Sequence, residues 1–225
     1  MFNNKITDAK EARYYSSYLS KNSVITIVDT KIGNFRSIHN MLKRISVNSI
    51  LTNDIEEIKK AEKIILPGVG SFDQGMRALK DYDLVHVLQD KSECLRTKIL
   101  GICLGMQLLA HSSEEGEISG LGIISGKVRL LNLKNGIKVP HMGWNYAIPV
   151  QESELFKNFD IAPRFYFTHS YWFDCTHKKN VLSETMYGSM ITSSVYRDSR
   201  IFGVQFHPEK SHRFGMKILQ NFAQC

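Results

Sequence analysis

The sequence predicts an α/β fold with a mostly parallel central sheet, covered by helices on both faces and extended by antiparallel strands. In the first half of the chain, short apolar runs alternate with stretches of helical periodicity, which is typical of parallel βαβ units. In the second half, strand candidates follow one another closely, with turns between them, which favours antiparallel pairing. Three glycine- or proline-containing motifs lie just past strand ends, where such sheets bind ligands.

The first half supplies the expected parallel strands and their helices. The predicted strands span residues 24–28, 49–51, 63–66 and 98–102, and the predicted helices span 34–44, 72–80 and 84–96, with another beginning in 104–111. In the first helix, Phe35, Ile38, Met41 and Leu42 recur at helical spacing, so we expect them in the core.

The second half supplies the antiparallel additions and a closing helix. The expected strands are 128–133, 146–149, 164–168, 181–185, 189–193 and 201–206, and the helix is 211–222. No proline- or serine-rich linker and no internal repeat interrupts the pattern, so we expect one domain over residues 23–225. Residues 1–22 form an N-terminal extension, either a disordered arm or a short helix capped by Asp8 with Glu11.

Composition and charge favour a soluble globular protein and argue against a nucleic-acid-binding one. Of the 225 residues, 43% are hydrophobic and 23% charged, as in soluble globular proteins. The net charge of +7 comes from scattered basic residues without a Lys/Arg block, so we expect no nucleic-acid partner. The same charge would suit an anionic partner subunit or a phosphorylated substrate.

The cysteines and apolar runs indicate a cytoplasmic enzyme. The four cysteines show no paired spacing, so we expect reduced thiols and no structural zinc or other metal. No apolar run approaches ~18 residues, and the N-terminus lacks the apolar core of a signal peptide, so we expect no membrane association.

A cysteine between two glycines is the first candidate for chemistry. Residues 101–105 (Gly-Ile-Cys-Leu-Gly) join an apolar run to a helix candidate, which is the setting of a nucleophile elbow. Cys103 would lie at a helix N-terminus, where the dipole favours a thiolate and the Leu104 N–H can bind an oxyanion. Taken alone, a buried apolar cysteine is the simpler interpretation.

A histidine and a carboxylate form the second candidate. His207 and Glu209 are two residues apart, so on extended backbone both side chains leave the same face. A carboxylate on one imidazole nitrogen leaves the other nitrogen to take a thiol proton. Taken alone, this spacing equally fits a structural histidine beside a surface glutamate; with Cys103 it predicts covalent acyl transfer.

A third motif, Pro-Gly-Val-Gly-Ser-Phe at residues 67–72, follows the strand candidate 63–66. Its glycines let backbone N–H groups turn toward a ligand. The alternatives are a second oxyanion donor facing Cys103, a phosphate loop, or an ordinary strand-to-helix turn. No Gly-Lys-Ser/Thr follows, which argues against the phosphate loop.

These three motifs, in this order, resemble the class I (triad) glutamine amidotransferases, whose sheet is flavodoxin-like. Residues 25–37, 140–145 (Pro-His-Met-Gly-Trp-Asn) and 166–171 (Tyr-Phe-Thr-His-Ser-Tyr) narrow the resemblance to the glutaminase subunits of imidazole glycerol phosphate synthase. The resemblance runs from about residue 24 to the C-terminus. The segment 140–145 is specific to the narrower group, whereas the cysteine and His-x-Glu motifs define only the wider class.

The resemblance implies a role for each matched residue. Cys103 would attack the side-chain amide of L-glutamine and form a thioester, His207 would be the general base, and Glu209 would orient it. Backbone N–H groups of Leu104 and of the Gly68–Val69 segment would bind the oxyanion, the second being misaligned in much of the family until the partner signals. Glutamine would be held by Gly70, Gln107, Glu115, Ser170 and Tyr171, and the partner would contact Met142, Trp144, Asn145 and Lys210.

The same resemblance implies a heterodimer. The synthase (cyclase) subunit would use the ammonia to make imidazole glycerol phosphate in histidine biosynthesis, without a cofactor. One departure is Asp29-Thr30-Lys31, where the family usually has Asp-Tyr-Gly, in a loop toward the partner side. It motivates an alternative, a paralogue supplying ammonia to a sugar amidotransferase of surface-polysaccharide synthesis.

Two other classes of function are weighed against these. A catalytically silent regulatory subunit would not need the intact cysteine, histidine and glutamate. A free-standing hydrolase would turn over rapidly without a partner.

Overall fold

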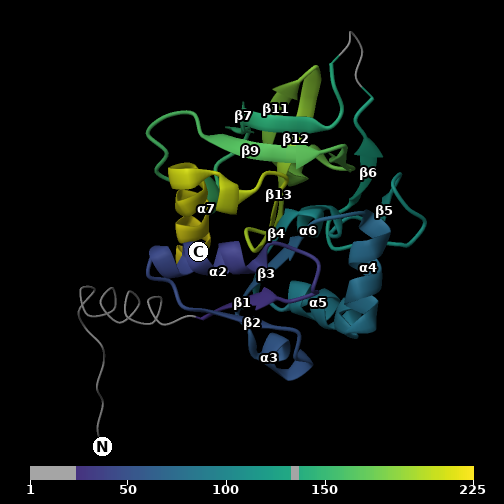
Figure 1. Ribbon diagram of the computed structural model, residues 1–225, viewed down its shortest axis with the longest axis vertical. Coiled ribbons are helices and arrows are strands. Elements are labelled where there is room, and N and C mark those ends of the chain that lie inside the picture. Colours follow the sequence, from purple (N-terminus) through teal and green to yellow (C-terminus); the bar gives the residue numbers. More distant parts are fainter. Residues whose placement is uncertain (1–23, 133–136) are drawn as a thin grey trace, which may run out of the picture.

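The computed structural model describes residues 24–132 and 137–225, and its centre is an eight-stranded sheet (Figure 1). The first five strands in spatial order are parallel, and the last three are antiparallel, which confirms a mostly parallel sheet with antiparallel additions. In that order the strands are β2 (Ser49–Thr52), β1 (Ile25–Val28), β3 (Lys63–Gly68), β4 (Lys98–Cys103), β13 (Ile201–Val204), β12 (Ser189–Arg197), β11 (Val181–Tyr187) and β8 (Ile148–Pro149). The strand expected over 201–206 was wrongly grouped with the antiparallel additions, since it pairs in parallel with the strand that ends at Cys103. The strands expected over 128–133 and 164–168 lie in two smaller sheets.

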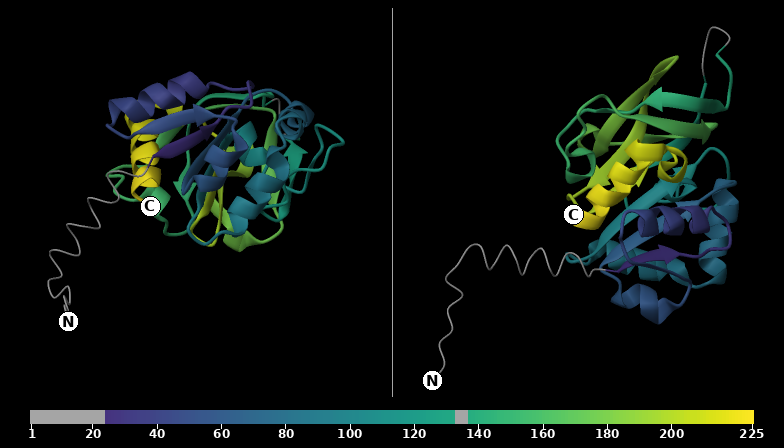
Figure 2. Two further views of the ribbon diagram at one scale, coloured as in Figure 1. Left: turned by 90° about the horizontal axis from the view of Figure 1, so that it is seen from below. Right: turned by 60° about the vertical axis from the view of Figure 1, so that its left-hand side comes forward.

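Helices cover both faces of this sheet (Figure 2). One face packs against α2 (Phe35–Arg44) and α7 (His212–Gln224), and the other against α3 (Ile55–Lys60), α4 (Phe72–Asp81), α5 (Leu84–Glu93) and α6 (Leu104–Gln107). Successive strand residues point to opposite faces. Thus Ile64 and Leu66 of β3 join the core beneath α4 and α5, while Ile65 joins the core beneath α2 and α7.

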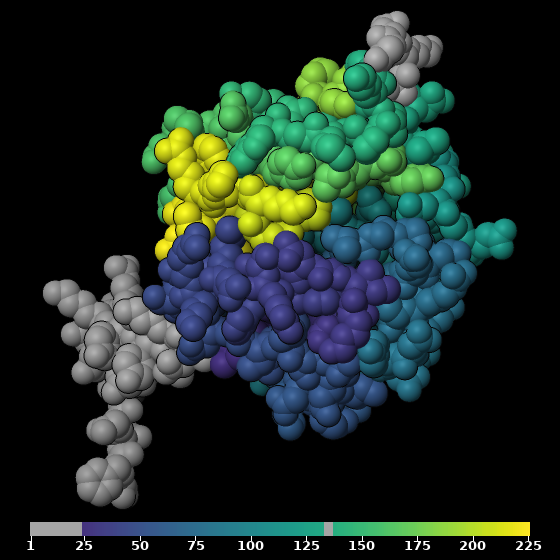
Figure 3. All heavy atoms as spheres, viewed as in Figure 1, coloured from purple at the N-terminus to yellow at the C-terminus, as the bar shows by residue number. Residues whose placement is uncertain are grey.

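Two small sheets lie beyond the main one. In the first, β6 (Gly126–Leu130) pairs with β5 (Ser112–Ser113) and β10 (Tyr171–Cys175). In the second, β7 (His141–Tyr146) pairs antiparallel with β9 (Arg164–His169). Figure 3 shows α7 (yellow) between the N-terminal part of the described chain (purple) and the green segments at the top of the molecule.

Most predicted elements agree with the structure to within a few residues, but four are new. No sequence pattern predicted α3, β5, β7 or β10 as separate elements. Helix α3 is only six residues long, and it begins where the Asp54 side chain accepts a hydrogen bond from Glu57 N–H at 2.9 Å. Short 3₁₀ turns are also present: η1 (Glu154–Phe156), η2 (Lys178–Asn180) and η3 (Pro208–Lys210).

Several predicted elements end early, among them the helix expected over 84–96, which ends at Glu93, and one expectation falls outside the described part. The helix expected over 104–111 is a single turn, since the Leu109 and Ala110 N–H groups bond three residues back. The strand expected over 201–206 ends at Val204. The predicted N-terminal extension, residues 1–22, lies outside the described residues. Within those residues, no helix combines the length and apolar character that crossing a lipid bilayer requires.

The turn from β4 into α6 lies unusually close to β3. A Cβ atom on Gly105 would lie 1.8 Å from the Leu66 backbone oxygen, and one on Gly101 would lie 2.6 Å from the Gly105 oxygen. Both glycines are therefore required by backbone contact, since no side chain there can move aside.

We expect Gly105→Ala to lower the free energy of unfolding by about 3 kcal/mol or more, because β3 or the turn must shift to admit the methyl group. Gly75→Ala is the matched control. Its Cβ would meet only Leu104 and Leu108 side-chain carbons at 3.0–3.1 Å, and alanine favours the helix by about 1 kcal/mol. Urea denaturation of both variants tests this, and equal midpoints for Gly105→Ala and wild type would contradict it.

Candidate active site

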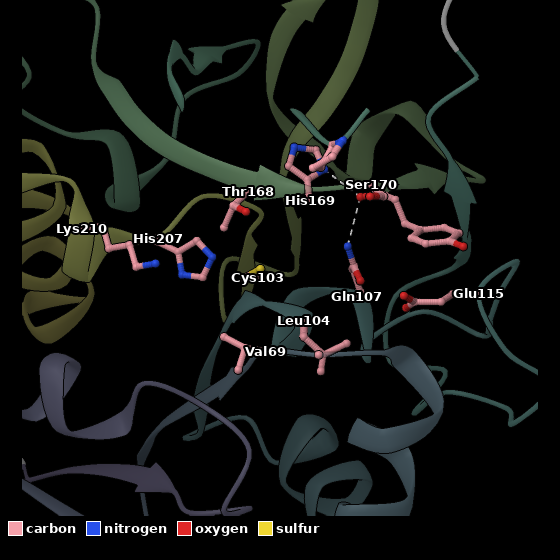
Figure 4. A pocket seen from close by; sticks show the side chains of 13 residues that line it. Val69, Cys103, Leu104, Gln107, Glu115, Thr168, His169, Ser170, His207 and Lys210 are labelled. Atoms are coloured by element: carbon pink, nitrogen blue, oxygen red, sulfur yellow. Dashed lines mark hydrogen bonds between the residues drawn. The ribbon is translucent and has the colours of Figure 1, made fainter. Parts of the chain in front are cut away.

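A cavity of about 360 Å³ lies at the carboxyl ends of β3, β4 and β13, a size usual for small-molecule sites (Figure 4). The structure brings together there residues from all three motifs and from the turn between β9 and β10. The cavity is lined by Val69, Gly70, Cys103, Leu104, Gln107, Glu115, Pro140, Thr168, His169, Ser170, Tyr171, His207 and Lys210.

Cys103 occupies a strained turn at the end of β4. Its φ of 54° and ψ of −110° are unfavourable for a residue with a side chain, and the close packing of Gly101 and Gly105 holds it there. Because α6 is only one turn long, the macrodipole contributes less than the sequence indicated. What remains is the set of first-turn N–H groups, which have no partner within the helix.

His207 and Glu209 form a buried pair. His207 Nδ1 lies 2.8 Å from Glu209 Oε1, and both side chains are 2% exposed. Glu209 belongs to the 3₁₀ turn η3, so the turn, and not the expected extended backbone, brings the two together. His207 Nε2 is buried without a hydrogen-bond partner, and Figure 4 shows the ring facing Cys103.

The pair changes the protonation of His207. Burial alone lowers its pKa, but contacts with Cys103 and Glu209 outweigh burial and raise the pKa to about 10. The imidazole therefore stays protonated at neutral pH. A protonated imidazole beside a cysteine sulfur is the arrangement that supports a thiolate nucleophile.

The backbone after β3 faces the cysteine. Gly68 pairs with Cys103 in the β3–β4 ladder, and a Cβ on Gly68 would lie 3.0 Å from Leu104 Cβ. Val69 and Gly70 line the cavity, and Gly70 has a φ of +99° that favours glycine. Of the three expected oxyanion residues, Val69 and Leu104 line the cavity and Gly68 packs behind Leu104.

All five residues of the expected glutamine-binding set line the cavity, but two of them also hold its walls. Gln107 Nε2 donates to the Tyr171 carbonyl at 3.1 Å and to Gln205 Oε1 at 3.0 Å. Glu115 Oε2 accepts from the Phe72 N–H at 2.8 Å, at the start of α4. These bonds join Gln107 of α6 to β10 and Glu115 to the start of α4, and so hold the walls of the cavity in place.

Sequence reasoning missed several residues of the site. Pro140, Thr168 and His169 line the cavity, and Gln205 Nε2 lies 3.7 Å from Cys103 Sγ. Gln205 is the one amide side chain in the apolar segment just before His207, and this isolated polarity was the available signal.

The expected partner-facing residues do not lie on one surface. Met142 and Trp144 are 63% and 42% exposed on the outer face of β7, while Asn145 points the other way and donates to the Met186 carbonyl at 3.0 Å. Lys210 lines the cavity, with its Nζ 5.4 Å from the centre of the Tyr166 ring. Tyr146, also on the outer face of β7, is 47% exposed and was not predicted.

The Asp29-Thr30-Lys31 loop shows why the resemblance leads us to expect a glycine at its third position. Lys31 has a φ of 62°, a conformation that glycine adopts more readily. Its N–H donates to Asp29 Oδ1 at 3.0 Å, and its ammonium pairs with the same carboxylate. The turn is therefore kept without glycine by contacts with Asp29.

Known proteins resemble this chain in sequence over most of its length. A family model described as glutamine amidotransferase class-I matches residues 26–225. Imidazole glycerol phosphate synthase subunit HisH 2 of Methanococcus maripaludis is 51% identical, covering 88% of this chain and 98% of the relative. Subunit HisH of Bdellovibrio bacteriovorus is 42% identical, covering 89% of this chain and 100% of the relative.

Solved structures resemble the fold. A protein from Thermoplasma acidophilum, described as a putative GMP synthase subunit, superposes with a TM-score of 0.68 at 20% identity, covering 89% of this chain and 92% of its own. PurLQS from Thermotoga maritima gives a TM-score of 0.68 at 20% identity, covering 88% and 96%. At this identity the likeness concerns the fold alone.

We expect Glu209→Gln to lower the pKa of His207 toward its ordinary value of 6.5, measured by NMR titration of the ring. Because folding raises this pKa, the contact stabilises the fold fully below pH 6.5, and the stabilisation is lost as pH rises through about 10. The variant should therefore lose about 3 kcal/mol of unfolding free energy near pH 6 and less near pH 10.

Glu56→Gln is the control for this experiment. Its side chain is 67% exposed and pairs with Lys59 on the surface, so its removal should change stability by less than about 0.5 kcal/mol at either pH. A loss for Glu209→Gln that does not vary with pH would contradict the assignment.

Proposed function

The chain belongs to the class-I glutamine amidotransferases and, within them, to the HisH subunits of imidazole glycerol phosphate synthase, and from this we propose how its cavity hydrolyses L-glutamine. The observation that carries the proposal is the buried Glu209–His207 pair, whose second imidazole nitrogen faces Cys103 on a strained turn. This is the arrangement of a nucleophile, a base and an orienting carboxylate.

The first half-reaction forms a thioester. Cys103 Sγ attacks the side-chain carbonyl carbon of glutamine, and the carbonyl electrons move to oxygen as an oxyanion. The Leu104 N–H and an N–H of the Gly68–Val69 segment stabilise that oxyanion. His207 then gives its proton to the leaving nitrogen, and ammonia departs as the carbonyl re-forms.

The second half-reaction releases glutamate. Water attacks the thioester carbon, His207 takes a proton from it, and the sulfur leaves as the carboxylic acid forms. Glu209 keeps the imidazole oriented through both steps and stabilises its charged form. Gly70, Gln107, Glu115, Ser170 and Tyr171 hold the rest of the substrate.

We propose that the ammonia passes to a cyclase subunit docked on the outer face of β7. The curated relatives are named as subunits of imidazole glycerol phosphate synthase. Met142, Trp144 and Tyr146 expose apolar surface along one strand, hereafter the β7 surface, and Pro140 just before β7 lines the cavity. Exposed aromatic and methionine side chains are enriched in protein interfaces.

We expect Cys103→Ala to reduce glutamine hydrolysis at least about a thousandfold, because no other group can form the thioester. Cys94→Ala is the control, since Cys94 lies at the far end of α5 and should leave turnover unchanged. Ammonia release in the presence of the cyclase subunit measures both. Turnover retained in Cys103→Ala would refute the mechanism.

Met142→Glu should weaken binding of the cyclase subunit by about tenfold or more, because it places a charge in an apolar contact. Leu95→Glu is the matched control: Leu95 is 81% exposed and lies before β4, at the end of the sheet opposite the cavity. Calorimetric titration with the cyclase subunit tests this. A wild-type chain that neither binds nor responds to this subunit would instead favour another ammonia acceptor.

A further inference from the structure

Strand β7 has two faces with different chemistry. Met142, Trp144 and Tyr146 form the exposed β7 surface, and the alternate residues His141 and Asn145 point inward. His141 is 2% exposed, and it lies directly opposite His169 in the β7–β9 ladder. A partner that moves the outer face therefore moves the inner side chains with it, because both belong to one strand.

The inward side chains form a hydrogen-bonded chain with a fixed direction. The Tyr171 carbonyl can only accept, so His169 Nδ1, at 2.8 Å, carries the proton. His169 Nε2 must then accept from His141 Nδ1 at 3.0 Å. His141 Nε2 in turn accepts from Asn145 Nδ2 at 3.2 Å.

Asn145, at the outer end of this series of hydrogen bonds, is also held in place. The other Asn145 N–H donates to the Met186 carbonyl at 3.0 Å, and Asn145 Oδ1 accepts from the Tyr146 N–H at 2.8 Å. The amide therefore has one orientation that satisfies all three contacts. His141 is stacked between Phe167 and Tyr187, with ring centroids at 4.7 and 3.9 Å, so its ring is held in plane.

Both histidines stay neutral at the pH of the reaction. Burial lowers the pKa of His141 to about 4. Burial also lowers the pKa of His169 to about 3, with the neighbouring histidines lowering it further and the Tyr171 carbonyl opposing them. Protonation therefore does not disturb the direction of the chain.

The His169 end of this hydrogen-bonded chain leads to the nucleophile, Cys103. The Tyr171 carbonyl that accepts from His169 also accepts from Gln107 Nε2, at 3.1 Å. Gln107 bonds to Gln205, whose amide nitrogen lies 3.7 Å from Cys103 Sγ. Strand β9 also holds the other side of the site, because the Tyr166 carbonyl accepts from the His207 N–H at 2.9 Å.

We propose that Asn145, His141 and His169 are positioning residues that couple the β7 surface to the glutamine-binding wall of the cavity. A cyclase subunit docked on Met142, Trp144 and Tyr146 shifts these inner side chains, and through the Tyr171 carbonyl sets Gln107 and Gln205 against Cys103. The inference rests on the proposed function and adds to it a route by which the partner stimulates turnover.

The direction of the hydrogen bonds is tested first, in the protein without a partner. Nitrogen-15 NMR distinguishes the two neutral tautomers of histidine, and we expect both His141 and His169 as the Nδ1–H form. A His169 protonated on Nε2 would overturn the inference, because its bond to His141 would then run the other way.

The coupling is tested with His141→Phe, which keeps the aromatic stack and removes both hydrogen bonds. We expect glutamine hydrolysis by the isolated chain to stay within about twofold of wild type, and the stimulation by the cyclase subunit to fall about tenfold, as the loss of such bonds allows. Tyr187→Phe is the matched control, since it keeps the stack on His141 and removes only the bond to the Lys138 carbonyl. It should respond to the cyclase as wild type does.

Comparison of kcat and KM with and without the cyclase subunit separates the outcomes. An equal loss in basal and stimulated turnover would show a merely structural role and overturn the inference, as would full stimulation of His141→Phe. If His141→Phe does not fold, His141→Leu, which also removes both hydrogen bonds, decides by the same criteria. Failure of the proposed function would appear in the wild type itself, as turnover that the cyclase leaves unchanged, and would overturn the coupling with it.

Discussion

The whole site depends on how closely the turn after β4 approaches β3. Gly105 packs against the Leu66 carbonyl with no room for a side chain, and Gly101 packs against Gly105 in turn. This contact forces Cys103 into a conformation with a positive φ at the place where the residue lines the cavity. The packing energy of a large buried sheet sustains this local strain, which an isolated turn could not.

Around that nucleophile, β9 serves two parts of the site at once. Its Tyr166 carbonyl holds the backbone of His207, and its end at His169 forms part of the cavity wall. Because β9 pairs with β7 and not with the main sheet, the pair can shift without breaking the ladder that carries Cys103. Cys103 and this part of the cavity wall therefore lie on different sheets.

Local patterns were enough to predict the four parallel strands of the first half and the triad candidates, because each is encoded within a few residues. The spacing of Phe35, Ile38, Met41 and Leu42 predicted α2, and all four are buried. The bond between His141 and His169 could not be predicted, since it depends on the register of two strands that brings together residues 28 positions apart in the sequence. Gln205 was hidden for a similar reason: only the packed structure puts its amide beside the sulfur.

The alternation of β7 also bears on how such a subunit can diverge. Every second position is exposed, while His141 and Asn145 between them point inward, so the two sets of residues can be altered separately. A substitution at an outward position changes the surface that β7 exposes and leaves the inward side chains as they are. A single short strand therefore allows the two sets of side chains to be substituted one at a time, although the backbone that they share still links their positions.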